Sequence, residues 1–207
     1  LGDVYKRQVL ETDPRYAGLY ADAVKIAEAT DRIPMPGQIG DQITNFWQDA
    51  GHVHGIWRTT TPASYATATP QWRTLLDLDA LSTAEKTGWV WKGADCEPVG
   101  ERLCLLNLSN GGEDATSQRE FDLGSGAMVQ GGFALPTSKQ NVTWENADSL
   151  LVARDWGPGT MTTSSYPFVV KRLRRGQPLE QAAEIFRGKP SDVSASPNSF
   201  VDGQGHR

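Results

Sequence analysis

A repeat of about fifty residues limits the fold of this chain more than any other feature of its sequence. Short strand-like stretches recur along the chain and align on Ile43, Val90, Val142 and Val193, with steps of 47, 52 and 51 residues. Strands and turns that repeat every 40–50 residues or so are typical of β-propeller blades, whereas helical solenoids usually have shorter, helix-periodic repeats. The repeat therefore predicts an all-β fold: a partial β-propeller of about three blades plus the start of a fourth.

The period and the polar or glycine-rich turns set the boundaries of these predicted blades. We place three blades near residues 41–81, 88–135 and 140–188, with a fourth blade starting at residue 192. In the second blade the stretch RLCLLNLS is apolar on both faces, as expected of a strand packed between two neighbouring blades. Because a propeller must close to protect its last edge strand, we expect residues 37–207 to be an incomplete propeller, cut from a larger protein.

A helical segment is expected before the propeller. Residues 9–36 are predicted to form one α-helix and a linker, with the helix over residues 13–30. Asp13 can cap this helix and Pro14 suits its first turn, while the prolines of DRIPMP end it. Residues 1–8 contain DVYKRQ, which matches a translation of the transposon end used to prepare sequencing libraries. We therefore expect residues 1–8 to be a non-native, adapter-derived tail.

The composition argues against two classes of partner. A net charge of −5 disfavours binding to nucleic acid or to an anionic membrane surface. No apolar run approaches the roughly 20 residues that a membrane-spanning helix needs. We expect neither a nucleic-acid partner nor a membrane partner. The compartment stays open between cytoplasm, periplasm and secretion, with the cytoplasm favoured.

Two groups of residues could bind a metal or form a cross-link. Cys96 and Cys104 flank a hairpin loop and could form a disulfide if their Cα atoms lie about 4.4–6.8 Å apart. The alternative is that they are two small, buried apolar side chains. His52 and His54 share one face of a strand beside Asp49, but no third metal ligand is evident, so we interpret them as turn and edge residues.

Charged and aromatic side chains suggest further sites. The one basic cluster lies on a predicted strand and is interpreted as a solvated outer edge, with binding of a substrate carboxylate as the alternative. The cluster consists of Lys171, Arg172, Arg174 and Arg175. The aromatic residues recur at equivalent places in the blades, which favours packing between blades over a carbohydrate or peptide groove. This set contains Phe46, Trp47, Trp57, Trp72, Trp89, Trp91 and Trp144.

Two long stretches of the sequence resemble the prolyl oligopeptidase family of serine peptidases. They read QITNFWQDAGHVHGIWRTTTPASYATATPQWRTLLDLDAL and WVWKGADCEP, and residues 45–96 are the specific part of the match. Weaker similarity continues through DWGPGTMTTSSYPFVVKRLRRG, and the preceding helical segment also resembles that family. The resemblance is to the amino-terminal part of the family's propeller domain.

The resemblance implies both an architecture and an activity. Members of the family couple a propeller of about seven blades to an α/β-hydrolase domain with a Ser, Asp and His triad. The two domains enclose a cavity that admits short peptides. This chain contains no G-x-S-x-G elbow, so we predict no catalytic residue, no cofactor site and no metal site in it. We expect a propeller fragment that gates a serine-type peptidase, is inactive alone, and packs against a hydrolase domain that this chain does not contain.

Two other functions were weighed against this one. The first is a non-enzymatic β-propeller binding module, which would need no nucleophile elbow anywhere in its gene. The second is a glycosidase acting in the propeller channel, which needs two carboxyl groups about 5–9.5 Å apart. Asp77 and Asp79 alternate with Leu76 and Leu78, so they are expected on the outer, solvated face of a strand. The glycosidase is therefore the least favoured of the three functions.

Overall fold

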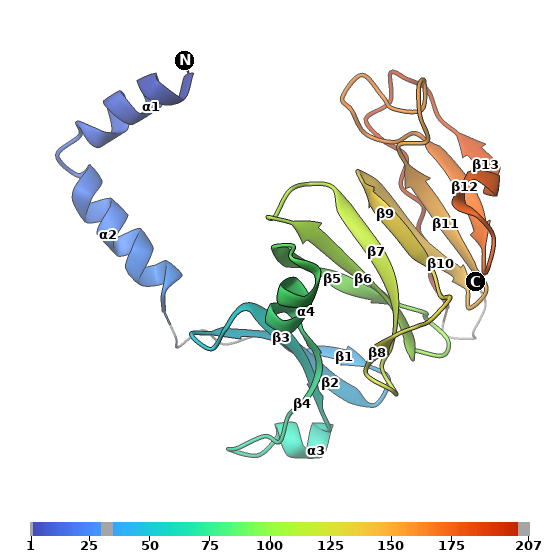
Figure 1. Cartoon of the computed structure of the whole chain (residues 1–207), viewed down its shortest axis with the longest axis horizontal. Helices are drawn as coiled ribbons and strands as arrows, with labels where there is room; N and C mark the ends of the chain where they lie inside the picture. The colour runs from blue at the N-terminus through green and yellow to red at the C-terminus, as the bar shows by residue number, and fades with distance from the viewer. Residues whose placement is uncertain (1, 30–34, 203–207) are drawn as a thin grey trace. The chain divides into compact units, whose positions relative to one another are not determined.

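A computed structural model describes residues 2–29 and 35–202 (Figure 1). The chain divides into two compact units, residues 1–34 and residues 35–207. In the described part, no helix is both long enough and apolar enough to cross a membrane.

The first unit contains two helices: the second lies within the predicted range of residues 13–30, and the first, which was not predicted, lies before it. Helix α1 spans Gly2–Glu11 and helix α2 spans Tyr16–Ala27. Between them, the Asp13 carboxylate accepts a hydrogen bond from the backbone N–H of Arg15 at 2.9 Å. Asp13 therefore closes a turn between the helices instead of capping a single long one.

The start of helix α2 and the residues of helix α1 differ in part from what the sequence predicted. Arg15 occupies the position directly before α2, so Pro14 does not open that helix. The predicted helix end at residue 30 lies outside the described residues. Residues 2–8 form most of α1, and the adapter-derived origin of residues 1–8 stays a prediction.

The second unit contains three antiparallel sheets in the order of the predicted blades (Figure 1). Blade one has the strand order β1-β2-β3-β4 and blade three the order β10-β11-β12-β13. Blade two has the order β5-β6-β7-β8, and β9 also pairs with β7. The strands span Gly37–Ile39 (β1), Gln42–Asp49 (β2), His52–Thr60 (β3), Arg73–Asp77 (β4), Trp89–Cys96 (β5), Leu103–Asn110 (β6), Thr116–Asp122 (β7), Ala127–Met128 (β8), Ala134–Ser138 (β9), Gln140–Asn146 (β10), Ser149–Arg154 (β11), Val169–Arg174 (β12) and Ala183–Arg187 (β13). The predicted series of three β-blades is confirmed.

Blade one differs from the prediction at its last strand. Strand β4 stops at Asp77, whose side chain caps helix α4 (Leu78–Glu85) by accepting the backbone N–H of Ala80 at 2.9 Å. Asp79 lies in the first turn of α4. The expectation that Asp77 and Asp79 share the solvated face of a strand is therefore wrong. An alternation of four residues fits a strand as well as a helix start, and here the capping aspartate decides between them.

Two short helical segments complete the second unit. Helix α3 spans Pro62–Tyr65 in the connection between β3 and β4, and Thr61 caps it. The 3-10 helix η1 spans Leu179–Gln181 and precedes β13. Among the described residues, η1 is the only helical element between β5 and β13.

Two apolar clusters lie between the blades. The first joins residues of blades one and two, and the second joins residues of blades two and three. Strand β6 contributes to both, because Cys104, Leu106 and Leu108 lie in the first cluster and Leu105 in the second. All four side chains are fully buried. The prediction that β6 is packed between neighbouring blades is confirmed.

The segment after β13 returns along blade three instead of starting a fourth strand. The backbone N–H of Ala195 donates to the carbonyl of Pro167 at 2.8 Å, and the Asn141 side chain donates to Ser196 Oγ at 3.1 Å. Residues 188–202 contain no strand, so the strand expected from residue 192 is not formed in the described part.

Candidate functional site

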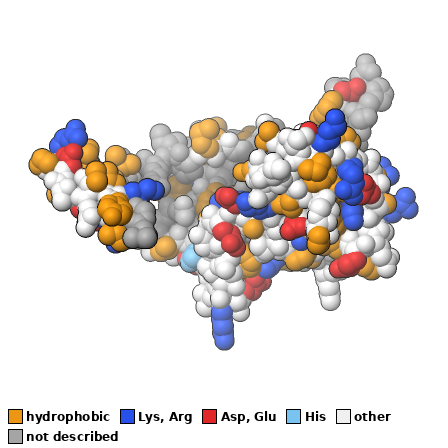
Figure 2. Space-filling view, turned by 90° about the horizontal axis from the view of Figure 1, so that it is seen from above, with side chains coloured by type: hydrophobic (Ala, Val, Ile, Leu, Met, Phe, Trp, Pro, Cys, Tyr) orange, Lys and Arg blue, Asp and Glu red, His pale blue; other side chains and the backbone are white. Residues whose placement is uncertain are grey.

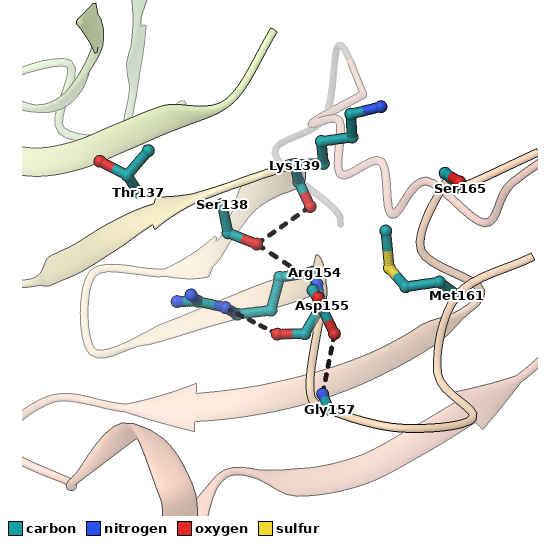
Figure 3. A pocket seen from close by; sticks show the side chains of 8 residues that line it. All are labelled: Thr137, Ser138, Lys139, Arg154, Asp155, Gly157, Met161 and Ser165. Atoms are coloured by element: carbon teal, nitrogen blue, oxygen red, sulfur yellow. Dashed lines mark hydrogen bonds between the residues drawn. The ribbon is translucent and has the colours of Figure 1, made fainter.

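A pocket of about 540 Å³ lies at the junction of blades two and three (Figure 3). Its walls come from the crossing between β9 and β10, from the end of β11 and from the loop after β11. The residues that line it are Thr137, Ser138, Lys139, Arg154, Asp155, Gly157, Met161 and Ser165.

Arg154 is the most deeply buried charge of this pocket. It is the last residue of β11, and it is only 8% exposed. Its Nε donates a long hydrogen bond of 3.3 Å to the carbonyl oxygen of Asp155, and its Nη1 is buried with no hydrogen-bond partner in the described chain. Burial lowers the pKa of the Arg154 guanidinium below its usual range.

The strand register explains why Arg154 is held there. Arg154 on β11 faces Gln140 on β10. The Gln140 Nε2 donates to the carbonyl oxygens of Thr116 in blade two and of Pro136 at 3.2 Å. The Gln140 Oε1 is also buried without a hydrogen-bond partner in the described chain. Two buried polar atoms without a hydrogen-bond partner in the described chain, Arg154 Nη1 and Gln140 Oε1, thus belong to facing residues at one blade junction.

The other polar walls are held by local hydrogen bonds. Ser138 Oγ donates to the carbonyl of Lys139 at 3.3 Å and accepts the backbone N–H of Asp155 at 3.4 Å. The Asp155 carboxylate accepts the backbone N–H of Gly157 at 2.9 Å. Figure 3 shows the carboxylate of Asp155 turned toward Gly157, with the Arg154 side chain extending the other way, beneath Ser138 in this view.

The two histidines expected at turns and edges make separate contacts. His52 Nδ1 lies 2.9 Å from Asp49 Oδ1, whereas His54 Nδ1 lies 2.9 Å from the backbone carbonyl oxygen of Trp89. Hydrogen bonds from the Trp47 indole and from His52 lower the pKa of Asp49 to about 2. Across residues 2–29 and 35–202, no group of three or more His, Cys, Asp or Glu residues could hold a metal ion.

The cysteines follow the first of the two alternatives that the sequence left open. Cys96 on β5 and Cys104 on β6 face each other in the strand register and form a disulfide. Cys104 is also fully buried in the cluster between blades one and two. The disulfide therefore ties the loop end of the β5–β6 hairpin to the core.

The basic cluster does not lie on an outer edge, so that interpretation is wrong. Strand β12 pairs with β11 on one side and with β13 on the other. On this strand Arg172 binds the Glu145 carboxylate through both Nε and Nη2, and this pairing lowers the pKa of Glu145. Lys171 lies over the Trp156 ring at 4.5 Å, while Arg174 is exposed. On the face seen in Figure 2, basic and acidic side chains are interspersed and do not form one basic patch.

The fourth member of the cluster joins two blades. Arg175 follows β12, and its Nη1 and Nη2 bind the Glu120 carboxylate of blade two at 2.8 and 3.0 Å. The Glu120 side chain is completely buried, and it also accepts the backbone N–H of Phe133 at 2.7 Å. Arg175 stacks on the Phe133 ring at 4.7 Å. This ion pair is a clamp between blades two and three.

Most of the aromatic set packs between blades, as predicted. Trp91 of blade two stacks on Phe46 of blade one and tilts against Trp57, with ring centroids 5.2 Å apart in both pairs. Trp144 of blade three is 1% exposed, and its indole Nε1 donates to the backbone carbonyl of Asp95 in blade two at 2.8 Å.

Two tryptophans of this set have a different role. Trp47 and Trp72 enclose the Arg58 guanidinium, with ring centroids at 4.3 and 4.4 Å. Arg58 also donates to Asn45 at 2.8 Å. These rings hold one arginine within blade one, so packing between blades does not explain their positions.

Sequence reasoning missed Arg154 and Glu120. Each residue lies in a strand whose sequence mixes apolar residues with polar or small ones. The role of each is set by a residue on another strand, which the neighbouring sequence does not reveal. A signal was present for Arg154, because it ends the buried run SLLVAR. An arginine at the end of a buried strand indicates a possible binding site, since charged residues are rarely buried without a partner.

Comparison with known proteins places this geometry in a family. A family model described as the prolyl oligopeptidase N-terminal beta-propeller domain matches residues 3–200. An uncharacterized peptidase of Sinorhizobium fredii is 53% identical over 187 residues, which cover 90% of this chain and 26% of that protein. An uncharacterized peptidase of Rickettsia prowazekii is 29% identical over 167 residues, which cover 77% of this chain and 23% of that protein. The chain thus spans about a quarter of the length of these curated relatives.

Solved structures support the same fold. The structure of a post-proline cleaving enzyme from Rickettsia typhi matches with a TM-score of 0.82 at 24% identity, covering 96% of this chain and 30% of that one. Oligopeptidase B from Trypanosoma brucei matches with a TM-score of 0.60 at 16% identity, covering 99% of this chain and 27% of that one. The family model covers nearly all of the three-bladed unit described above. The chain belongs to the prolyl oligopeptidase family and represents part of its N-terminal β-propeller domain.

Proposed function

We propose that this chain is the first part of a propeller that gates a serine-type peptidase acting on short peptides. The observation that carries the proposal is the match of residues 3–200 to the family's propeller model. The catalytic serine, aspartate and histidine would then lie in an α/β-hydrolase domain that packs on the propeller. In this division of work the blades select substrates by size and the hydrolase domain cleaves them.

The blade junctions support a gating role because they are firmly closed. Blades two and three are joined by the Arg175–Glu120 clamp and by the bond from the Trp144 indole to blade two. Blades one and two are joined by the hydrogen bond of 3.1 Å from Arg73 Nη2 to the carbonyl oxygen of Leu123. Peptides would therefore not pass between these blades, and access would depend on the channel and on the domain boundary.

A non-enzymatic binding module is the alternative. Its three blades could be the same as those described here, because a fold alone does not determine an activity. The two proposals differ in the remainder of the gene: a peptidase requires a G-x-S-x-G elbow with Asp and His following in chain order, whereas a binding module does not.

The test is hydrolysis by the uninterrupted gene product, measured with a short proline-containing reporter peptide. We expect cleavage that a serine-directed inhibitor abolishes, and no cleavage of the same sequence placed inside a folded protein. The 207-residue chain serves as the control, and we expect it to cleave neither substrate. No hydrolysis by the whole protein would support the binding module instead, whereas hydrolysis that the inhibitor does not affect would contradict a serine mechanism.

A further inference from the structure

Arg154 differs from three other arginines of blade three, which all form ion pairs. Each of those holds a carboxylate of the chain in an ion pair, and the pairs are Arg172 with Glu145, Arg175 with Glu120 and Arg187 with Glu184. Arg154 is more deeply buried than any of them, yet it makes no ion pair with a residue in the described ranges, 2–29 and 35–202. Asp155 and Glu180 act on its charge only through space, so Arg154 lacks a direct ion pair within the described chain.

Such a charge is costly to bury. A guanidinium taken out of water loses hydration free energy, which only close hydrogen bonds or a direct ion pair can restore. The long Nε bond to Asp155 and the distant Trp156 ring, 5.8 Å away, offset little of this loss. Buried charges in proteins are usually paired directly, and an anion from outside the chain would supply the direct pair that Arg154 lacks here.

The pocket offers suitable groups around this cation. Thr137 and Ser165 line it, are exposed, and make no side-chain hydrogen bond within the described structure. The two long hydrogen bonds of Ser138 leave its hydroxyl able to rearrange toward a stronger acceptor. Asp155 is the one carboxylate of the pocket, and its Oδ1 is already engaged by Gly157.

The charge of the pocket indicates the class of ligand. Among the lining residues, Arg154 and Lys139 carry two positive charges and Asp155 one negative charge, which sums to +1; Glu180, which does not line the pocket, adds a negative charge that acts on Arg154. A single carboxylate matches this charge, whereas a phosphate dianion exceeds it. The planar guanidinium fork also fits the two oxygens of a carboxylate in a bidentate arrangement.

We propose that the Arg154 pocket binds the terminal carboxylate of a short peptide. Arg154 binds the two carboxylate oxygens beside Ser138, while Thr137 and Ser165 line other parts of the same pocket and offer hydroxyls to the rest of the peptide. A pocket of about 540 Å³ can contain such a group with one or two residues. The peptide source of the carboxylate rests on the proposed function. Binding of a carboxylate by the pocket does not depend on that function.

The experiment measures binding to the 207-residue chain by titration calorimetry and by the amide NMR shifts of Ser138 and Asp155. The probes are an N-acetylated tripeptide with a free carboxyl group, the same tripeptide as its C-terminal amide, acetate and inorganic phosphate. We expect the free acid to bind at least about tenfold more tightly than the amide, since a charge-assisted bidentate contact is lost in the amide. Binding of the free acid should shift both amides.

Two variants and one control assign the binding to Arg154. Arg154→Met should weaken binding of the free acid about tenfold or more, and Arg154→Lys should give an intermediate loss because a lysine keeps the charge without the fork. Arg187→Met should leave binding within about twofold, since Arg187 is exposed and already paired with Glu184. If Arg154→Met does not fold, the lysine variant and the wild-type amide shifts still decide the question.

The outcomes separate cleanly. Equal binding of acid and amide, an unchanged affinity in Arg154→Lys and Arg154→Met, or tighter binding of phosphate than of the free acid would overturn the proposal. Acetate binding that depends on Arg154, with no binding of either tripeptide, would retain the carboxylate site and remove its peptide source. Free-acid binding together with an uninterrupted gene product that cleaves no peptide would refute the proposed function and leave this site standing.

Discussion

Removing either partner of the Arg175–Glu120 clamp should destabilise the chain, and the two losses should be unequal. The Glu120 side chain is fully buried, whereas the Arg175 side chain is 30% exposed. Arg175 also has the Asp148 carboxylate at 3.2 Å as a second partner. Without Arg175, the Glu120 carboxylate is therefore a buried charge with no ion-pair partner. Without Glu120, Arg175 keeps contact with water and with Asp148.

The magnitudes follow from this asymmetry. Arg175→Met strands the buried carboxylate and should cost about 3–5 kcal/mol of unfolding free energy. Glu120→Gln keeps the side-chain shape and an acceptor for the Phe133 N–H, so it should cost less, about 1.5–3 kcal/mol. The double variant should cost less than the two single costs added together, by about 1 kcal/mol or more, because the residues share one interaction.

The assay is urea unfolding followed by tryptophan fluorescence, with the exposed pair as a matched control. Arg187→Met removes an arginine from the Glu184 ion pair, in which both side chains are well exposed, and should change the unfolding free energy by no more than about 0.5 kcal/mol. Equal costs for Arg175→Met and Glu120→Gln, or strictly additive costs in the double variant, would refute the reasoning that burial of Glu120 sets the strength of the clamp.

Three further changes test other parts of the structure. Trp144→Phe removes the indole donor to blade two and should cost about 1–3 kcal/mol in the same urea assay; a cost near zero would show that this bond does not hold the junction. Reduction of the Cys96–Cys104 disulfide, which spans 8 positions, should lower the unfolding free energy by about 2–3 kcal/mol, measured with and without reductant. Glu145 has its pKa lowered in the folded chain, chiefly by Arg172, so its contribution is present above the unfolded-state pKa of about 4.3 and is lost as the pH falls through the folded value. The stability difference between wild type and Glu145→Gln should therefore be seen at pH 7 and disappear in acid; a difference that grows in acid would reverse the assigned sign.

Strand positions could be predicted because period-two alternation and turn residues agree along most of the chain. The clearest case is β6, whose two apolar faces predicted a strand between two blades before any contact was known. Segments where a local hydrogen bond decides the outcome were not predicted. Asp77 ends β4 by capping α4, and Asp13 bonds to Arg15 in the turn before α2, so Arg15 rather than Asp13 holds the position that precedes this helix. In both places the side chain competes with regular structure, and hydrophobic pattern alone does not weigh that competition.

The candidate site was beyond sequence reasoning for a different reason. Arg154 becomes notable only through its burial and through its register opposite Gln140, and both depend on how β10 and β11 pair. The basic cluster was visible as charge, but its role changed once Arg175 met Glu120, a residue 55 positions earlier in the sequence. Contacts at that separation arise from the packing of blades and leave no local pattern.

Hydrolysis by the intact gene product decides whether these three blades belong to a peptidase. The uninterrupted gene product is incubated with a short proline-containing reporter peptide, with and without a serine-directed inhibitor, beside a variant in which the serine of its G-x-S-x-G elbow is replaced by alanine. We expect hydrolysis that both the inhibitor and the substitution abolish. A whole protein that lacks such an elbow, or that leaves the peptide intact, would contradict it.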